Sequence, residues 1–212
     1  MRTVKLHPSL RVALAVVTLA FAAGAPLAAK EPISRAGFAA DMRKLWEDHI
    51  TWTRLFLVDA TAGLPSKDAT TARLLQNQTD IGDAIKPFYG DAAGTKLTGL
   101  LRDHILIAAD LVGAAAAGDK AKQDAANKRW FANADEIAAF LSGANPKNWP
   151  AADAKSMMHD HLNLTTKEVV AHLGKDWKAD VAAYDAVHAQ ILHMADMLSS
   201  GIEKQFPNKF TG

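Results

Sequence analysis

A short triplet of aspartate, histidine and a branched aliphatic residue occurs three times in this chain of 212 residues. The three copies are Asp48-His49-Ile50, Asp103-His104-Ile105 and Asp160-His161-Leu162. The histidines at 49 and 104 are 55 positions apart, and those at 104 and 161 are 57 apart. A near-constant period of this length indicates a repeated supersecondary unit, so we expect three copies of one unit.

Each copy continues in the same way after its histidine. An amide side chain follows 28 or 29 residues later, and a second polar residue comes three positions after the amide. The three pairs are Asn77 and Asp80, Asn133 and Glu136, and Gln190 and His193. A glycine lies at or beside the midpoint between each histidine and its amide: Gly63, Gly118 and Gly174. Because glycine often ends a helix, each unit is predicted to be two antiparallel helices. Each histidine should then lie level with its amide, about 21 Å from the turn.

Apolar residues recur with helical spacing through most of the chain, and no β-branched stretch alternates as a half-buried strand would. Glycine, proline and N-cap residues mark the ends of six predicted helices. These helices cover about 35–61, 67–85, 93–117, 120–141, 151–173 and 177–204. The sequence therefore predicts an all-α fold, an up-and-down bundle of three repeated αα-hairpins at about 35–90, 91–145 and 146–206. No linker divides them, so 30–212 is expected to be a single domain.

The first 29 residues have the pattern of a cleaved secretory signal peptide. Arg2, Lys5 and Arg11 precede an uncharged apolar run over 12–23, and small residues follow as far as Ala29. The apolar run is too short to cross a bilayer, which takes roughly 20 residues. We therefore expect cleavage after Ala29, a periplasmic or secreted protein, and no stable membrane insertion after cleavage.

Charge and cysteine content exclude several classes of partner. Without the first 29 residues, 21 of the 24 basic residues remain against 23 acidic ones, a net charge of about −2. Such a surface gives no electrostatic footprint for nucleic acid. The sequence has no cysteine, which excludes disulfides, thiolate metal sites, covalently attached c-type haem and iron–sulfur clusters.

All three histidines and all three amides fall in the apolar stripes of their predicted helices, because apolar residues flank them at offsets of three, four and seven. If the hairpins pack side by side, these groups form one buried layer. Imidazole and carboxylate groups suit a divalent transition metal such as zinc, copper or iron. The predicted metal ligands are His49, Asp80, His104, Glu136, His161 and His193. The amides Asn77, Asn133 and Gln190 are predicted to contact the ion or a small polar ligand.

A structural alternative stays open, because a histidine on an apolar face needs a hydrogen-bond partner and duplication would repeat the pair. The chain would then be a structural or interaction module whose histidine/amide pairs only fix helix packing. An enzyme is less well supported, since no nucleophile recurs beside the histidines and no phosphate loop or nucleophile elbow occurs. Glu168 and His172, four residues apart on one helix face, are interpreted as a surface pair.

Two motifs, Trp46-x-x-His49-x-x-Trp52-Thr53-Arg54 and Arg73-Leu74-Leu75-x-Asn77-x-x-Asp80-Ile81, carry a resemblance. It continues in Pro87-x-Tyr89-Gly90, His104-Ile105-Leu106, Ala132-Asn133-Ala134-Asp135-Glu136-Ile137 and Gln205-Phe206-Pro207. On these residues the chain resembles an uncharacterised family of bacterial all-helical proteins, some of them exported. The resemblance implies a shared helical fold and brings no established activity with it.

Overall fold

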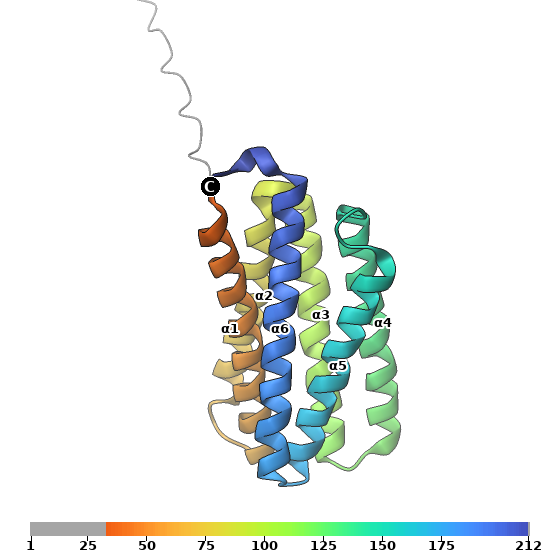
Figure 1. Ribbon diagram of the computed structural model, residues 1–212. Coiled ribbons are helices and arrows are strands. Elements are labelled where there is room, and N and C mark those ends of the chain that lie inside the picture. The colour runs from red at the N-terminus through yellow and green to blue at the C-terminus, as the bar shows by residue number, and fades with distance from the viewer. Residues whose placement is uncertain (1–32, 212) are drawn as a thin grey trace, which may run out of the picture. The chain divides into compact units, whose positions relative to one another are not determined.

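The computed structural model describes residues 33–211, and Figure 1 shows them as a bundle of long helices. The predicted signal peptide over 1–29 lies outside the described residues. The six helices of the described part are α1 (Arg35–Ala62), α2 (Lys67–Tyr89), α3 (Asp91–Ala116), α4 (Lys120–Ala144), α5 (Ala151–Leu173) and α6 (Trp177–Gln205). The predicted all-α, up-and-down architecture of three hairpins is confirmed. None of these helices combines the length and the apolar composition that crossing a membrane requires.

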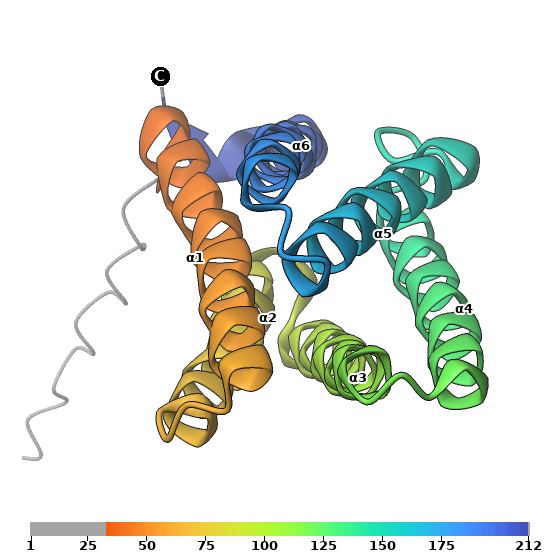
Figure 2. The same cartoon turned by 90° about the horizontal axis from the view of Figure 1, so that it is seen from below.

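The helices form a closed ring. Each packs against its neighbours in sequence, and α6 returns to pack against α1. Figure 2 shows this ring from below, with α1–α2, α3–α4 and α5–α6 following one another around it. Helix α3 also contacts α1 and α5 across the ring. The first helices of the three hairpins therefore meet near the axis, and these are the helices that carry the repeated histidines.

The three hairpin turns lie at the same end of the bundle, the lower end in Figure 1. Gly63 and Gly118 end their helices in the left-handed conformation, with φ of 64° and 68°. The third turn differs, because Gly174 has a φ of −73° and the left-handed residue is Lys175, with φ of 59°. A residue with a Cβ adopts this conformation at a cost of about 1–2 kcal/mol. At this turn Lys175, and not the predicted Gly174, is therefore the residue in the left-handed conformation.

The helix ends differ from the predicted ones mainly around Pro87. Helix α2 was predicted to end near 85, but it continues through Pro87 to Tyr89. Proline lacks an N–H and removes one helical hydrogen bond. Here Pro87 stands in the last turn of α2. The carbonyl oxygen of Lys86, the residue just before it, still accepts from the N–H of Gly90 at 2.9 Å, so the helical hydrogen bonding continues past the proline. The short connection lets α3 begin at Asp91 rather than near 93.

Two glycines allow the backbones of α2 and α3 to approach closely. A Cβ added to Gly82 would lie 2.7 Å from the carbonyl oxygen of Gly94, and one added to Gly94 would lie 2.6 Å from that of Gly82. Both distances are shorter than real Cβ contacts allow. This contact joins the first hairpin to the second.

The apolar core has two parts. The larger cluster contains Trp46, Ile81 and Trp130 and extends to the end of the bundle away from the turns, where it includes Phe38 and Ile202. A smaller cluster lies toward the turns and consists of Phe56, Leu57, Leu74, Ile105 and Val112. At the end away from the turns, β1 (Ile33–Ser34) pairs in parallel with β2 (Phe210–Thr211), after the short 3-10 helix η1 (Pro207–Lys209). The two ends of the described chain are therefore held together.

Candidate functional site

The structure brings His49, His104 and His161 together, and we call them the histidine triad. They come from α1, α3 and α5, and only 3–4% of each residue is exposed. The ring centroids of His49 and His161 are 5.8 Å apart, and those of His104 and His161 are 6.4 Å apart. One histidine from each hairpin thus lies in a shared buried layer, at the height that the distance from the turns implied.

In the second and third hairpins the amide holds the histidine in the same way. The side-chain nitrogen of Asn133 donates to the carbonyl oxygen of Leu100 at 3.1 Å, and its oxygen lies 2.8 Å from Nδ1 of His104. Gln190 repeats this, with its nitrogen 3.2 Å from the carbonyl oxygen of Met157 and its oxygen 3.1 Å from Nδ1 of His161. An amide oxygen only accepts, so Nδ1 of both histidines carries the proton and Nε2 carries the lone pair.

The first hairpin uses a different residue. Asn77 still donates to the carbonyl oxygen of Leu45 at 3.0 Å, but the group that faces Nδ1 of His49 is Nε2 of Gln78, at 3.4 Å. The same Gln78 nitrogen donates to the carbonyl oxygen of Leu74 at 2.8 Å and to Oδ1 of Asn77 at 3.2 Å. Those two acceptors fix the orientation of the Gln78 amide, and because the amide has only two hydrogens, Nδ1 of His49 receives a shared contact at most. A proton on Nδ1 would point at the amide hydrogens, so the proton of His49 is placed on Nε2.

Sequence reasoning missed Gln78, although the repeat contained a signal. The residues after the amide in the other two hairpins are Ala134 and Ile191, both fully buried. Gln78 occupies the equivalent position and is itself 0% exposed. A polar residue at a position where the other repeats have core residues indicates that it serves a buried polar neighbour, in this case His49.

Burial keeps the triad uncharged. Desolvation lowers the pKa of His104 to about 3 and that of His161 to about 4, and it lowers the pKa of His49 well below its ordinary value. The other rings of the triad lower the pKa of His49 further, as does His161 for His104. The amide contacts act in the opposite direction and are the smaller effect. All three imidazoles are therefore neutral near pH 7.

A cavity of about 330 Å³ extends from the triad toward the turn end of the bundle. Its walls are mainly aliphatic and aromatic, and include Phe56, Leu57, Leu74, Ile105, Leu111, Val112, Trp130 and Val169. Lys120 and Asp124 of α4 and Val170 of α5 line it at exposed positions, which places its mouth between these two helices. The cavity thus connects the triad with the surface.

The threonine hydroxyls of the cavity wall are not free to bind a ligand. The hydroxyls of Thr53, Thr165 and Thr166 each donate to the carbonyl oxygen four residues earlier in their helix, at 2.7–2.9 Å. Nε2 of each triad histidine, in contrast, has no hydrogen-bond partner within residues 33–211. The triad therefore offers one N–H, from His49, and two lone pairs, from His104 and His161.

The structure does not bring the other predicted metal ligands to the triad. Glu136 and His193 are exposed, and Asp80 lies beside Arg73 at 3.6 Å and accepts from Gln76. Helices α2, α4 and α6 form the outer part of the ring, so only a narrow face of each points to the axis. The amide occupies that face, and the residue three positions later is rotated to one side. The expectation that Asp80, Glu136 and His193 join the buried layer is corrected.

Within residues 33–211, no group of three or more histidine, aspartate or glutamate side chains is arranged to hold a metal ion. In the assigned tautomers His104 and His161 present Nε2 lone pairs, and His49 presents an Nε2 N–H.

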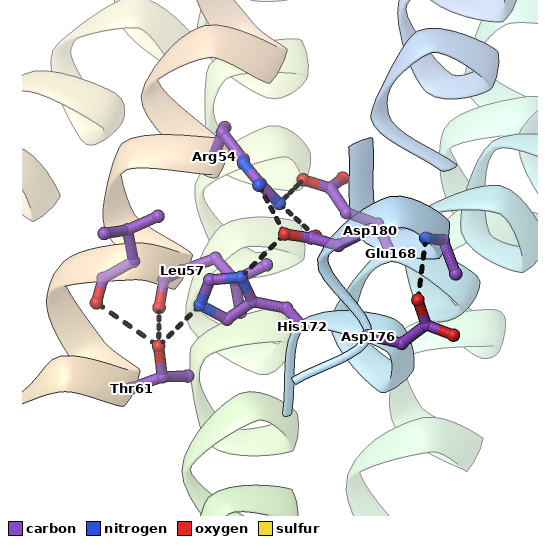
Figure 3. Close-up of polar contacts among 9 residues, drawn as sticks. Arg54, Leu57, Thr61, Glu168, His172, Asp176 and Asp180 are labelled. Atoms are coloured by element: carbon purple, nitrogen blue, oxygen red, sulfur yellow. Dashed lines mark hydrogen bonds and ion pairs between the residues drawn. The ribbon is translucent and has the colours of Figure 1, made fainter. Parts of the chain in front are cut away.

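A second buried polar group lies nearer the turns, and Figure 3 shows it; we call it the Arg54 cluster. Arg54 of α1 donates to Glu168 of α5 at 3.0 Å and to both carboxylate oxygens of Asp180 of α6, one of them at 2.6 Å. His172 places Nδ1 3.1 Å from Asp180 and Nε2 3.0 Å from the hydroxyl of Thr61. Glu168 and Asp180 are only 3% and 2% exposed. The interpretation of Glu168 and His172 as a surface pair is therefore wrong.

The two carboxylates of the Arg54 cluster have opposite pKa shifts. Hydrogen bonding from Arg54 lowers the pKa of Asp180. Desolvation raises the pKa of Glu168, and the contact with Arg54 only partly opposes this. Arg54 makes two hydrogen bonds to Asp180 and one to Glu168, so Asp180 is the better compensated of the two.

No family model matches this chain, and neither the curated proteins nor the solved structures contain a significant match. The resemblance to bacterial all-helical proteins therefore stays a prediction. The fold and the site themselves define the class of protein: a ring of six helices that encloses a buried histidine triad at the inner end of an apolar cavity.

Proposed function

We propose that this protein binds a small organic molecule in the cavity, with a polar group of the ligand at the histidine triad. The observation that carries the proposal is the convergence of three buried imidazoles on one cavity, each with an unpartnered Nε2 in the described part of the chain. None of the three nitrogens belongs to the fully enclosed unpartnered atoms of residues 33–211, so a ligand that enters the cavity can reach all three.

The triad and the walls define what the ligand must look like. A group that donates to His104 or His161 and accepts from His49 matches the tautomers, and hydroxyl and amide groups do both. The cavity of about 330 Å³ is larger than the roughly 150 Å³ apolar cavity that accommodates benzene. Its walls favour a ligand with an apolar body of one or two rings or an equivalent aliphatic chain.

A divalent metal ion is the second candidate, and one observation favours it. Metal-binding histidines usually donate their other ring N–H to an oxygen, and His104 and His161 do so to Asn133 and Gln190. The structural alternative rests on the same contacts, since each amide also joins two helices. Under that alternative the histidine/amide pairs fix the packing of the hairpins and bind nothing.

We also propose that the protein acts in the periplasm or outside the cell. The support is the sequence of residues 1–29, in which basic residues, a short apolar run and small residues follow one another as they do in secretory signal peptides.

Nuclear magnetic resonance of the mature chain with benzyl alcohol, a neutral aromatic probe, tests the proposal. We expect saturable shift changes at residues around the triad. Ala108 lines the cavity, so Ala108→Phe should fill it and abolish these changes. Leu106→Phe on the same helix is the matched control, because Leu106 is 47% exposed. Equal binding by both variants, or none by the wild type, would overturn the proposal.

Thermal unfolding distinguishes the other two candidates. One equivalent of zinc should raise the Tm if a metal ion is the ligand, because binding only to the native state stabilises it. His104→Gln should remove that rise. A Tm that responds to neither zinc nor organic probes would support the structural alternative.

A further inference from the structure

Glu168 is a second polar group on the wall of the same cavity. It lies seven residues after His161 on α5, roughly 10 Å along the helix axis. Only 3% of it is exposed, and it lines the cavity. One of its oxygens, Oε1, accepts from Arg54 at 3.0 Å, while Oε2 has no hydrogen-bond partner among residues 33–211. Figure 3 shows this carboxylate with a single contact.

The positive partners in the Arg54 cluster lie mainly at Asp180. Arg54 is shared by two buried carboxylates, and it makes two hydrogen bonds to Asp180 and one to Glu168. His172 also faces Asp180, with Nδ1 3.1 Å from it, and does not contact Glu168. Within the described part of the chain, Glu168 therefore has a single hydrogen bond for its two oxygens. A carboxylate with so few donors is costly in a buried site, where little water reaches it.

The other charged groups at the cavity do not compensate Glu168. Lys120 and Asp124 stand at the mouth, form an ion pair with each other four residues apart on α4, and are both exposed. The triad is neutral and lies at the other end. Among the described residues that line the cavity, Glu168 is thus the buried residue whose side chain can carry a charge and bind a charged ligand group. Its raised pKa, caused first by desolvation, agrees with a carboxylate that is short of positive partners.

We infer that the ligand of this cavity is an organic cation, a small amine whose ammonium group lies beside Glu168 and whose apolar body extends toward the histidine triad. The inference rests on the proposed function, because it assigns a charge to the same ligand. The ammonium group supplies a positive charge beside Glu168 and a donor for Oε2. Phe56 and the aliphatic wall cover its apolar body, and a hydroxyl at the far end of the molecule reaches the triad.

Three probes of one shape and different charge test the inference on the mature chain: tyramine, 4-ethylphenol and 3-(4-hydroxyphenyl)propionate. Each has a phenol hydroxyl, and the other end is an ammonium group, a methyl group or a carboxylate. Calorimetric titration should show tyramine binding at least tenfold more tightly than 4-ethylphenol, with the carboxylate weakest. This comparison uses only the wild-type chain, so it does not depend on whether a variant folds.

Glu168→Gln then locates the charge. We expect this variant to bind tyramine about as weakly as 4-ethylphenol and to keep its affinity for 4-ethylphenol. Glu136→Gln is the matched control, since Glu136 is exposed and makes the same change of charge away from the cavity. It should retain the preference for tyramine.

The possible failures are distinguishable. If 4-ethylphenol binds as tightly as tyramine to the wild type, the cationic ligand is overturned while binding in the cavity stands. A preference for tyramine that survives in Glu168→Gln overturns the assignment to Glu168. Absence of binding by all three probes overturns both the inference and the proposed function.

Discussion

Nδ1 of His104 lies 2.8 Å from Oδ1 of Asn133, and the Asn133 amide nitrogen also donates to the carbonyl oxygen of Leu100, four residues before the histidine. One side chain thus fixes both the tautomer of a buried imidazole and the register of α4 against α3. Gln190 does the same for α6 and α5. This contact decides which nitrogen faces the cavity, so it links the packing of each hairpin to the chemistry of the triad.

Asn133→Leu should therefore destabilise the protein strongly for a change of nearly constant volume. It leaves Nδ1 of His104 and the Leu100 carbonyl without this partner, and each buried unpaired group costs about 1–3 kcal/mol. Asn127→Leu on the same helix is the control, because Asn127 is only half-buried, at the cavity wall. Urea unfolding should show the difference. An equal loss of stability in both variants would contradict the role of Asn133.

The neutral triad makes stability depend on pH, and the direction follows from the lowered pKa values. In the unfolded chain a histidine titrates near 6.5, but His161 and His104 titrate only at about 4 and about 3 in the folded protein. Between these values the unfolded state binds more protons. The free energy of unfolding is therefore fully present above about pH 6.5 and decreases as pH falls toward 4.

Urea unfolding from pH 7 to pH 4.5 measures this decrease, which should approach about 1.4 kcal/mol per pH unit for each titrating histidine. His161→Gln should reduce the slope. The carboxylates Asp135 and Asp196, whose pKa values are lowered by Lys155 and Arg43, act only at lower pH. An unchanged slope in His161→Gln would show that the triad is not its source.

The sequence predicted the height and the burial of the triad because both depend on local rules. Counting residues from a turn gives the height along an antiparallel hairpin, and apolar neighbours at helical spacing give the buried face. His49, His104 and His161 follow these rules. The position of the residue three places after each amide does not follow from these local rules. It depends on how much of each outer helix faces the axis of the bundle, and this is set by the way the six helices close into a ring.

The Arg54 cluster was beyond the reach of sequence patterns. Arg54 is 114 residues from Glu168 and 126 from Asp180, and these three meet only because α6 closes the ring against α1. A helix-face rule linked Glu168 with His172, but both side chains turn to partners on other helices instead. Long-range charge pairs follow from tertiary packing, which the single sequence does not specify residue by residue.

The close contact between α2 and α3 predicts that alanine substitutions at two glycines change the stability of the protein in opposite directions. Gly82→Ala should destabilise the protein by about 1–3 kcal/mol, because its Cβ would overlap the carbonyl oxygen of Gly94. Gly99→Ala should stabilise it by about 0.5–1 kcal/mol, since Gly99 is in the helical part of α3 and a Cβ there meets nothing within 4 Å. Thermal and urea unfolding of the two variants provide the comparison. The same sign for both would refute the close backbone contact.

Removing the guanidinium of Arg54 should reveal how much the cluster depends on this positive charge. Arg54→Met leaves Glu168 and Asp180 buried beside each other without their cation, and breaking a buried pair in this way costs about 3 kcal/mol or more. Arg43→Met is the matched control, because the pair of Arg43 with Asp196 lies in solvent, and it should change stability little. Adding Glu168→Gln to Arg54→Met should restore part of the loss, since one of the two buried carboxylates is then replaced by a neutral amide. Urea unfolding at pH 7 measures all three variants. If Arg54→Met is no less stable than Arg43→Met, the two carboxylates are not held in their charged form, and Glu168 has no negative charge to offer a ligand.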